Sequence, residues 1–382
     1  MKIETLLANL ALNSDFKDPY GASHFPIYNT ATFDLKKQEG NDRIYDYSRS
    51  DNPTRNALEN IFAKAENGFG CVCTNTGIAA ISVLFETVLK NGDTVLVEND
   101  SYGGTYRLLK VLSEKNNIKT IYTDFTNLNL VEEELKNNEI SLILCESPTN
   151  PSLKIIDLEE IGKLSKKYNT LFAVDNSMAT FVSQKPLDLG ADFSVFSTTK
   201  FISGHGSVTA GAVVSKTKEL HQKVRFYANA YGNAQSPMDV YLTSLGLPTL
   251  VYRMKAQEES ALIIAKFLKN FPQIKSVKFP ALEDFEQYDL AKKQMSIIPA
   301  VLTIQLQDEE TANQLINNTK LFGKKVSFGT SDSRLEIPAK MSHATNSKDS
   351  LASKGIDNAT VRISVGLENT EDLIEDLSQA LQ

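Results

Sequence analysis

The stretch ADFSVFSTTKFISGHGS, residues 191–207, passes from an apolar run into small hydroxyl residues, a lysine, two glycines and a histidine. The run ADFSV is typical of a buried strand, so we expect Lys200 just beyond the end of that strand. A solvated surface lysine is the ordinary alternative. Chemistry is often done at the ends of buried strands, however, so the residues around Lys200 bear directly on function.

Apolar runs of this kind alternate with amphipathic, helix-like stretches from about residue 60 to about residue 215. Strands that alternate with helices indicate a mostly parallel sheet covered on both faces, which is an α/β fold. The expected strands are residues 94–98, 119–123, 141–146, 171–175, 193–197 and 210–214.

Polar residues gather at the predicted carboxyl ends of these strands. Glu146, Asp175 and Ser197 each end a strand, and Lys200 follows directly after the last of them. Ligands of such sheets bind beyond the carboxyl ends of the strands. One crevice is therefore expected to collect these side chains.

The pattern changes after about residue 240, where a long helix-like stretch, shorter strand-like runs and a closing amphipathic helix follow one another. They predict a smaller α+β domain. The N-terminal residues are rich in turn formers and aromatics, and we interpret them as an arm that contacts a neighbouring subunit. The expected division is an arm over residues 1–55, a large domain over 56–240 and a small domain over 241–382.

The composition favours an ordinary globular protein. Of the 382 residues 41% are apolar, and the formal net charge is −7. A mildly acidic chain has no global electrostatic reason to bind nucleic acid or an anionic membrane. No apolar run is long enough to span a membrane, and no signal-peptide pattern opens the sequence. The three cysteines lack the spacing of a zinc site, which predicts reduced thiols in the cytoplasm.

The pair formed by Lys200 and Asp175 allows two interpretations. It is either a structural ion pair or the pair that a pyridoxal phosphate enzyme needs. In such an enzyme the lysine forms a Schiff base with the cofactor, and the carboxylate keeps the pyridine nitrogen protonated so that the ring accepts electrons.

A phosphate site is also predicted, in TNTGIAAISVLF. Thr74, Asn75 or Thr76 can cap a helix there, and Gly77 lets the backbone approach an anion closely. Taken alone, this pattern is more often a well-capped helix. Two further signals favour the cofactor, because Ser197 and Thr199 flank the lysine with hydroxyls and Tyr102 can stack over a pyridine ring.

The motif TTKFISGH, residues 198–205, resembles the lysine signature of the Cys/Met-metabolism (transsulfuration) pyridoxal phosphate enzymes. Other blocks resemble the same family, in the same order, over nearly the whole chain. These blocks are PIYNTATF, YDYSRSDNPTR, SYGGTYR, ESPTNP, VDNSMAT, PAKMSHA and VRISVG. The resemblance implies pyridoxal 5'-phosphate as cofactor and the fold type I (aspartate-aminotransferase-like) architecture, with a smaller C-terminal domain.

The resemblance also implies a role for individual residues of the cofactor site. Lys200 would be the Schiff-base lysine and would move protons between substrate carbons. Asp175 would pair with the pyridinium nitrogen, and Tyr102 would stack on the ring and activate the substrate amine. The remaining cofactor contacts would be Gly77, Ile78, Ser197 and Thr199 at the phosphate and Asn150 near the ring 3-hydroxyl.

Two of the implied cofactor contacts come from a neighbouring subunit. Tyr47 and Arg49, in DYSRSDNP, would reach the phosphate, so the active site would require at least a dimer; the family usually forms tetramers. Arg362, in VRISVG, would hold the substrate α-carboxylate in a bidentate fork.

The residues that would contact the substrate follow the family pattern less closely than those that would contact the cofactor. Arg107 stands where several cystathionine-handling members have an arginine suited to a distal carboxylate, and a solvated helix residue is the alternative. In KVSFGTSDSRLEIPAK the family commonly has a pattern like SLGGxES, which makes Ser327 and Asp332 predicted substrate contacts. Asp332 would attract the distal ammonium of cystathionine, unless the loop is rebuilt for another substrate. Methionine γ-lyases usually carry a cysteine where this chain has Gly104, which disfavours that assignment.

The predicted function is elimination on a sulfur amino acid, foremost the cystathionine γ-lyase reaction. The alternatives are cystathionine β-lyase, and cystathionine γ-synthase or another transferase that uses O-acylhomoserine. A non-catalytic homologue is a remote alternative, because Lys200, Asp175 and Arg362 are all present. We predict no metal, since the four histidines are scattered without ligand spacing, and interpret His205 and His343 as loop supports.

Overall fold

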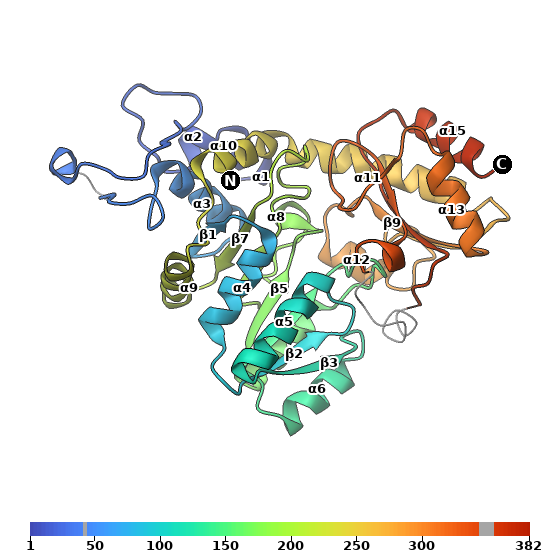
Figure 1. Cartoon of the computed structure of the whole chain (residues 1–382), viewed down its shortest axis with the longest axis horizontal. Coiled ribbons are helices and arrows are strands. Elements are labelled where there is room, and N and C mark those ends of the chain that lie inside the picture. Colours follow the sequence, from blue (N-terminus) through green and yellow to red (C-terminus); the bar gives the residue numbers. More distant parts are fainter. Residues whose placement is uncertain (41–43, 344–354) are drawn as a thin grey trace.

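The computed structural model describes residues 1–40, 44–343 and 355–382. Two β-sheets form two lobes, and a long helix runs between the lobes (Figure 1). Residues 41–43 of the predicted arm and Ala344 at the end of the PAKMSHA block lie outside the described residues.

The larger sheet has seven strands in the order β1-β7-β6-β5-β4-β2-β3. Strands β2 to β6 run parallel, whereas β7 is antiparallel to both β6 and β1. This confirms the predicted α/β fold, and each predicted strand agrees with an observed one to within a residue at either end. The strands are β1 (Gly70–Thr74), β2 (Thr94–Glu98), β3 (Lys119–Thr123), β4 (Leu142–Glu146), β5 (Leu171–Asp175), β6 (Phe193–Phe196) and β7 (Gly211–Ser215).

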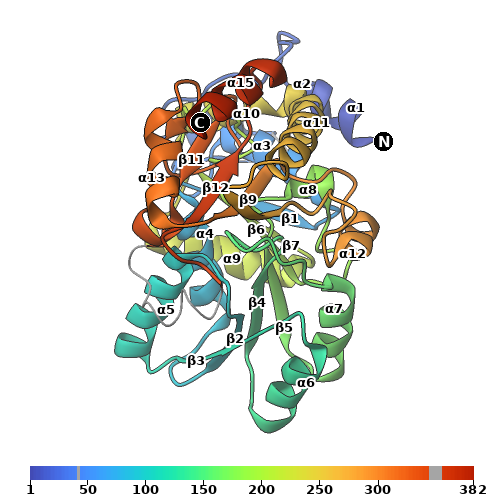
Figure 2. The same cartoon turned by 90° about the vertical axis from the view of Figure 1, so that its right-hand side faces the viewer.

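Alternating side chains explain why helices cover both faces of this sheet. Leu142 and Leu144 of β4 pack into one core cluster, whereas Ile143 and Cys145 pack into another. Helices α4, α5 and α9 contribute to the first cluster and α3, α6 and α7 to the second, and Figure 2 shows α5 and α7 on opposite sides of the strands. The helices of this lobe are α3 (Pro53–Glu66), α4 (Gly77–Val88), α5 (Gly103–Asn116), α6 (Leu128–Asn137), α7 (Leu158–Lys167), α8 (Thr180–Ser183), α9 (Lys218–Tyr231) and α10 (Pro237–Gly246).

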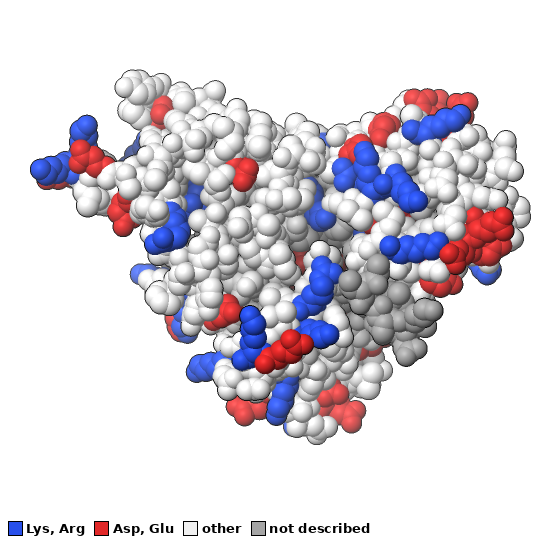
Figure 3. All heavy atoms as spheres, in the orientation of Figure 1, with Lys and Arg blue, Asp and Glu red and all other residues white. Residues whose placement is uncertain are grey.

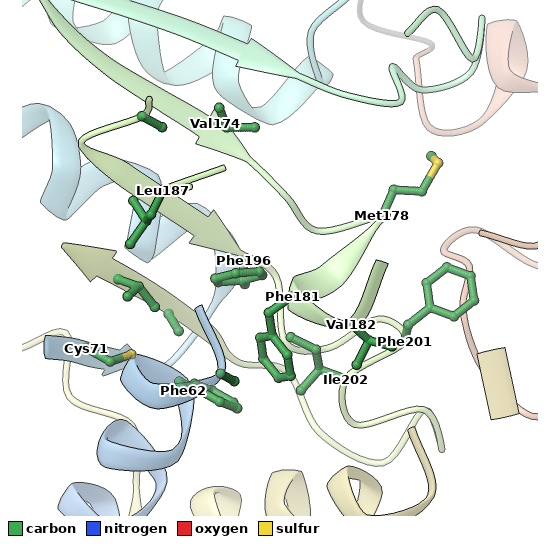
Figure 4. Close-up of a cluster of buried hydrophobic side chains, with 14 of the residues drawn as sticks. Phe62, Cys71, Val174, Met178, Phe181, Val182, Leu187, Phe196, Phe201 and Ile202 are labelled. Carbon is green, nitrogen blue, oxygen red and sulfur yellow. The ribbon is translucent and has the colours of Figure 1, made fainter. Parts of the chain in front are cut away.

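An aromatic core anchors the segment that follows β6. The Phe181 ring lies 5.5 Å from Phe62 and 5.7 Å from Phe196, measured between ring centroids. Figure 4 shows these three rings together, with Phe201 and Ile202 on the segment nearby. Both of these residues are buried and follow Lys200 directly, so the backbone that carries the lysine is held in place by apolar packing.

The small lobe has its own sheet and core. Its five strands lie in the order β10-β11-β12-β9-β8. They are β8 (Ile274–Lys278), β9 (Val301–Leu306), β10 (Gly323–Lys324), β11 (Arg334–Glu336) and β12 (Thr360–Ser364). Its helices are α11 (Leu250–Leu268), α12 (Tyr288–Gln294), α13 (Glu309–Asn318) and α15 (Thr370–Ala380), and α11 is the long helix between the lobes (Figure 1). The predicted boundary after residue 240 falls inside α10, and the division into domains remains a prediction.

The N-terminal segment holds α1 (Ile3–Ala8), α2 (Leu10–Asn13) and the 3-10 helix η1 (Leu35–Gln38), and a loop of this segment projects away from the large lobe (Figure 1). Two further 3-10 turns are η2 (Leu247–Thr249) and η3 (Pro338–Lys340). On the face drawn in Figure 3, acidic and basic side chains are interspersed. In the described part of the chain, we find no helix with the length and apolar character needed to cross a membrane.

Candidate active site

A cleft of about 460 Å³ lies between the carboxyl ends of β4 to β6 and the small lobe. The N-terminus of α4 and the start of α5 form one side of it, and residues 326–328 and Arg362 of the small lobe form the other. The predicted site residues that line it are Gly77, Ile78, Tyr102, Arg107, Asn150, Asp175, Ser197, Thr199, Lys200, Ser327 and Arg362. The structure thus brings most of the predicted residues together, while their individual roles remain predictions.

Lys200 lies in the turn after β6. Its Nζ donates a hydrogen bond to Ser327 Oγ at 2.6 Å and lies 4.9 Å from the centroid of the Phe328 ring. The pKa of Lys200 is lowered from 10.5 to about 8. Burial is the larger cause, and the positive charge of Arg362 is the second. A lysine with this pKa has an appreciable uncharged fraction near neutral pH, as a nucleophile or general base requires.

Asp175 ends β5 and is held by Ser177. The Asp175 Oδ1 atom accepts the Ser177 N–H at 3.0 Å and the Ser177 hydroxyl at 2.5 Å. Burial raises the pKa of Asp175, and the bonds from Ser177 and the charge of Lys200 oppose that rise. A carboxylate that is largely removed from water is stabilised by a cationic partner, and the protonated ring nitrogen of pyridoxal phosphate fits that requirement.

The first turn of α4 packs directly against β6 and β7. Thr76 caps this helix by accepting the Ala79 N–H at 3.0 Å. A Cβ added at Gly77 would lie 2.6 Å from Ser197 Cβ, and one added at Gly211 would lie 2.4 Å from Thr76 O. The two glycines therefore permit a close packing that leaves first-turn N–H groups beside the cleft, where they and the helix dipole suit a phosphate.

The hydroxyl of Thr199, one of the predicted phosphate contacts, is already engaged by the backbone. Its Oγ1 donates to Ala210 O at 3.2 Å and accepts the Ala210 N–H at 2.9 Å. To donate to a phosphate, Thr199 would have to release the carbonyl of Ala210.

Arg362 reaches the cleft from β12. Its Nη1 donates to Asn150 Oδ1 at 2.9 Å, and its Nη2 donates to Ser327 O at 2.5 Å. The Nη1 atom also lies 3.0 Å from Glu336 Oε1. Burial lowers the pKa of Arg362, whereas the negative charge of Glu336 raises it. A guanidinium held in this way is oriented before a carboxylate ligand arrives.

Tyr102 and Arg107 lie at the start of α5. The backbone N–H of Tyr102 donates to Glu146 Oε2 at 3.2 Å, which ties the start of the helix to the end of β4. Tyr102 is 38% exposed, so one surface of the residue is open to a ligand. Arg107 lines the same cleft from the following turn.

Tyr47 and Arg49 do not line the cleft of their own chain. Both lie in the N-terminal arm, where Arg49 Nε donates to Asn229 Oδ1 at 3.1 Å and Arg49 Cζ lies 5.1 Å from the Tyr47 ring centroid. Their predicted place is the cleft of a neighbouring subunit, and it remains a prediction.

Asp332 is likewise not among the residues that line the cleft. Its carboxylate pairs with Arg334 Nη2 at 2.9 Å and with Lys325 Nζ at 3.0 Å. Burial disfavours its charge, but the bonds from Arg334 and Lys325 outweigh burial and lower the pKa of Asp332. A carboxylate already paired twice is poorly suited to attract the distal ammonium of a substrate.

Sequence reasoning missed several residues in or beside the site, among them Ser177 and Glu336. Ser177, which positions Asp175, had a local signal, because a hydroxyl residue two places after a strand-ending acid can bond that acid. Glu336 pairs with Arg362, and no local sequence signal could have revealed this pair, because Arg362 lies on another strand. The three cysteines are free and buried, and the described residues contain no group of three or more His, Cys, Asp or Glu that could hold a metal ion.

Comparison with known proteins identifies the family. The family model described as Cys/Met metabolism PLP-dependent enzyme matches residues 4–382. A cystathionine gamma-lyase of Bacillus subtilis is 36% identical over 382 residues, which is 100% of each chain. An L-methionine gamma-lyase of Fusobacterium nucleatum is 39% identical over 96% of this chain and 95% of that protein.

A solved structure agrees in fold as well as in sequence. The cystathionine gamma synthase of Xanthomonas oryzae pv. oryzae, solved in complex with cystathionine, is 37% identical and superposes with a TM-score of 0.95 over 100% of this chain and 98% of that one. These findings confirm the predicted fold type I architecture, the resemblance drawn from the motifs, and pyridoxal phosphate as the cofactor. The chain belongs to the Cys/Met metabolism PLP-dependent enzyme family.

Proposed function

We propose that this chain is a carbon–sulfur lyase and, more specifically, a cystathionine γ-lyase, which converts cystathionine and water into cysteine, 2-oxobutanoate and ammonia. The observation that carries the proposal is the presence of Lys200, Asp175 and Arg362 in one cleft. They supply an amine of lowered pKa, a half-buried carboxylate and a guanidinium suited to a carboxylate ligand. Similarity to a cystathionine gamma-lyase and to a synthase solved with cystathionine supports this choice of substrate.

The cleft offers a contact for each part of the cofactor. Lys200 would hold its aldehyde carbon, Asp175 its ring nitrogen and Asn150 its 3-hydroxyl, while Tyr102 would cover the ring. When bound, the cofactor withdraws the electrons released at the substrate α-carbon. The proposed phosphate contacts from the same subunit are Gly77, Ile78, Ser197 and Thr199.

The protein's own groups would then orient the substrate and move its protons. Arg362 would bind the α-carboxylate and so fix the position of the α-carbon relative to Lys200. The amine of Lys200, with its pKa of about 8, would take the proton from that carbon and return it to another. Ser327 Oγ, bonded to Lys200 Nζ at 2.6 Å, would hold the free amine in place. Arg107 would contact the far end of the substrate.

The γ-replacement reaction is the second candidate, because the synthase structure matches over the whole chain with a TM-score of 0.95. It would join cysteine to an O-acylated homoserine with release of the acyl acid. The β-elimination of cystathionine to homocysteine, pyruvate and ammonia would need the same Lys200, Asp175 and Arg362. A non-catalytic homologue stays remote because the chain keeps all three.

The first experiment is mass-spectrometric analysis of the products formed from L-cystathionine by the cofactor-loaded protein, with Lys200→Ala as the inactive control. We expect cysteine and 2-oxobutanoate. Homocysteine and pyruvate would contradict γ-elimination and establish the β reaction. Parallel incubations with L-methionine, and with O-acylhomoserine plus cysteine, test the two reactions named for the other relatives.

We also propose that the smallest active unit is a homodimer and that the complete assembly is a tetramer. The support is that Tyr47 and Arg49 lie on the arm and outside the cleft of their own chain, as expected of residues that serve a neighbour. The three buried free thiols suit a reducing compartment, and we propose the cytoplasm.

A further inference from the structure

Glu336 and Arg362 form an ion pair that is built into the sheet of the small lobe. Glu336 ends β11, and Arg362 lies directly opposite it on the antiparallel strand β12. This pairing places Glu336 Oε1 3.0 Å from Arg362 Nη1, with 0% of the Glu336 side chain and 3% of the Arg362 side chain exposed. Because the strand register fixes the contact, the two charges meet whether or not a ligand is present.

Among the described residues, Glu336 has few other contacts. The Ser342 hydroxyl donates to Glu336 Oε1 at 2.5 Å and lies 2.8 Å from His343 Nδ1. A serine hydroxyl has one proton, so the contact with His343 requires the proton on Nδ1. Glu336 Oε2 is buried and has no hydrogen-bond partner among the residues that the structure describes. The main compensation for the charge of Glu336 is therefore Arg362.

The position of Arg362, in contrast, does not depend on Glu336 alone. Asn150 Oδ1 and Ser327 O accept hydrogen bonds from its two terminal nitrogens, at 2.9 Å and 2.5 Å. These two bonds would persist if Glu336 lost only its charge. The distinctive contribution of Glu336 is therefore electrostatic.

We propose that Glu336 is a permanent counter-ion of Arg362. In this role Glu336 stabilises the substrate-free cleft and weakens the binding of the substrate α-carboxylate by Arg362. A buried guanidinium without a ligand needs an opposite charge. An incoming carboxylate adds a second negative charge close to Glu336, and their repulsion reduces the affinity. The consequence is easier release of carboxylate-bearing products. The inference rests on the proposed function only in taking the ligand to be an α-amino acid.

The variant Glu336→Gln keeps the shape of the side chain and removes its charge. Two reagents that condense with the cofactor aldehyde probe its effect: aminooxyacetate carries a carboxylate, and O-methylhydroxylamine does not. We expect the second-order rate constant for aminooxyacetate to rise about tenfold in the holoenzyme variant, and that for O-methylhydroxylamine to stay unchanged. Glu336→Met, uncharged and of similar length, is a second variant with the same expectation.

Thermal unfolding gives an independent readout. Without ligand, Glu336→Gln should unfold at a lower temperature than the unaltered holoenzyme, because Arg362 has lost the carboxylate paired with it at 3.0 Å. Aminooxyacetate should then raise the unfolding temperature more in the variant than in the unaltered protein.

The matched control is Asp376→Asn, which alters another buried carboxylate of the small lobe. Asp376 accepts backbone N–H groups of residues 320–322 and does not line the cleft. The variant Asp376→Asn should lower the unfolding temperature. It should leave unchanged the ratio of the rate constant for aminooxyacetate to that for O-methylhydroxylamine.

The proposal would be overturned if, in the single variant Glu336→Gln, the rate constant for aminooxyacetate divided by that for O-methylhydroxylamine were unchanged or lower than in the unaltered protein. Neither reagent depends on turnover of a sulfur amino acid, so this result is independent of the product analysis. If neither reagent changed the absorbance of the unaltered protein, the cofactor site itself would be contradicted.

Discussion

At the scale of single residues, the pKa of Lys200 determines whether the cleft is reactive near neutral pH. Burial and the charge of Arg362 lower that pKa to about 8, so the uncharged amine becomes abundant near this pH. We expect an amine-reactive reagent to label Lys200 in the cofactor-free protein with a midpoint near pH 8. Arg362→Met removes a positive neighbour that disfavours the charged amine, so the midpoint should move to higher pH. Mass spectrometry of the Lys200 peptide across a pH series measures both midpoints.

Arg362→Lys is the matched control for this measurement, because it keeps a positive charge on the same strand. Its midpoint should stay close to that of the unaltered protein. A midpoint near 10.5 in the unaltered protein would contradict the effect of burial. An Arg362→Met midpoint that does not move would contradict the electrostatic effect of Arg362.

Residues at strand ends were predictable from the sequence, whereas pairs formed across strands were not. Asp175 and Lys200 could be placed in one crevice because the ends of parallel strands meet at one edge of the sheet. The pairing of Asp332 with Arg334 could not be derived from the motif, which only marked the loop as unusual. Glu336 was missed because only the register of β11 and β12 brings it to Arg362.

At the scale of elements, the proposed phosphate site depends on the close packing of α4 against β7. A Cβ at Gly211 would lie 2.4 Å from Thr76 O and 2.8 Å from Gly77 Cα. We therefore expect Gly211→Ala to displace the first turn of α4 and to weaken pyridoxal phosphate binding at least about tenfold. Absorbance titration of the cofactor-free protein measures this affinity.

Val213→Ala is the matched control on the same strand. Val213 is fully buried in the core, so its truncation should leave a cavity and lower the unfolding temperature. It should leave the affinity for pyridoxal phosphate unchanged. If Gly211→Ala bound the cofactor as tightly as the unaltered protein, the first turn of α4 would not be the phosphate site.

The positions of most strands in the large sheet could be predicted from the sequence, but the direction of β7 and the presence of β1 could not. Six strands of the large sheet follow from apolar runs that alternate with helices. The antiparallel direction of β7 could not be derived, because a buried strand has the same local pattern in either direction. The strand β1, with the sequence GCVCT, contains glycine and cysteine in place of the usual β-branched and aromatic residues, so it gave too weak a signal.

At the scale of the whole molecule, the proposed dimer rests on the position of the N-terminal segment that carries Tyr47 and Arg49. Tyr47 is 43% exposed, and with Arg49 it lies outside the cleft of its own chain. The arm was recognisable from its turn formers and aromatics, but a single sequence does not say which cleft it serves. In a two-fold dimer, the arm of each chain can reach the cleft of the other chain and complete its site.

Mixed dimers test this arrangement. Lys200→Ala and Arg49→Ala should each impair both sites of a homodimer, the first by removing the amine and the second by removing the proposed phosphate contact. If Arg49 serves the neighbouring subunit, a mixed dimer contains one site with both residues intact and one site with neither. Co-expression with two different affinity tags, followed by a lyase assay of the doubly purified dimer, should therefore recover about half the activity of the unaltered dimer. If Arg49 served its own subunit, every site of the mixed dimer would carry one defect, and the activity would stay at or below that of the Arg49→Ala homodimer.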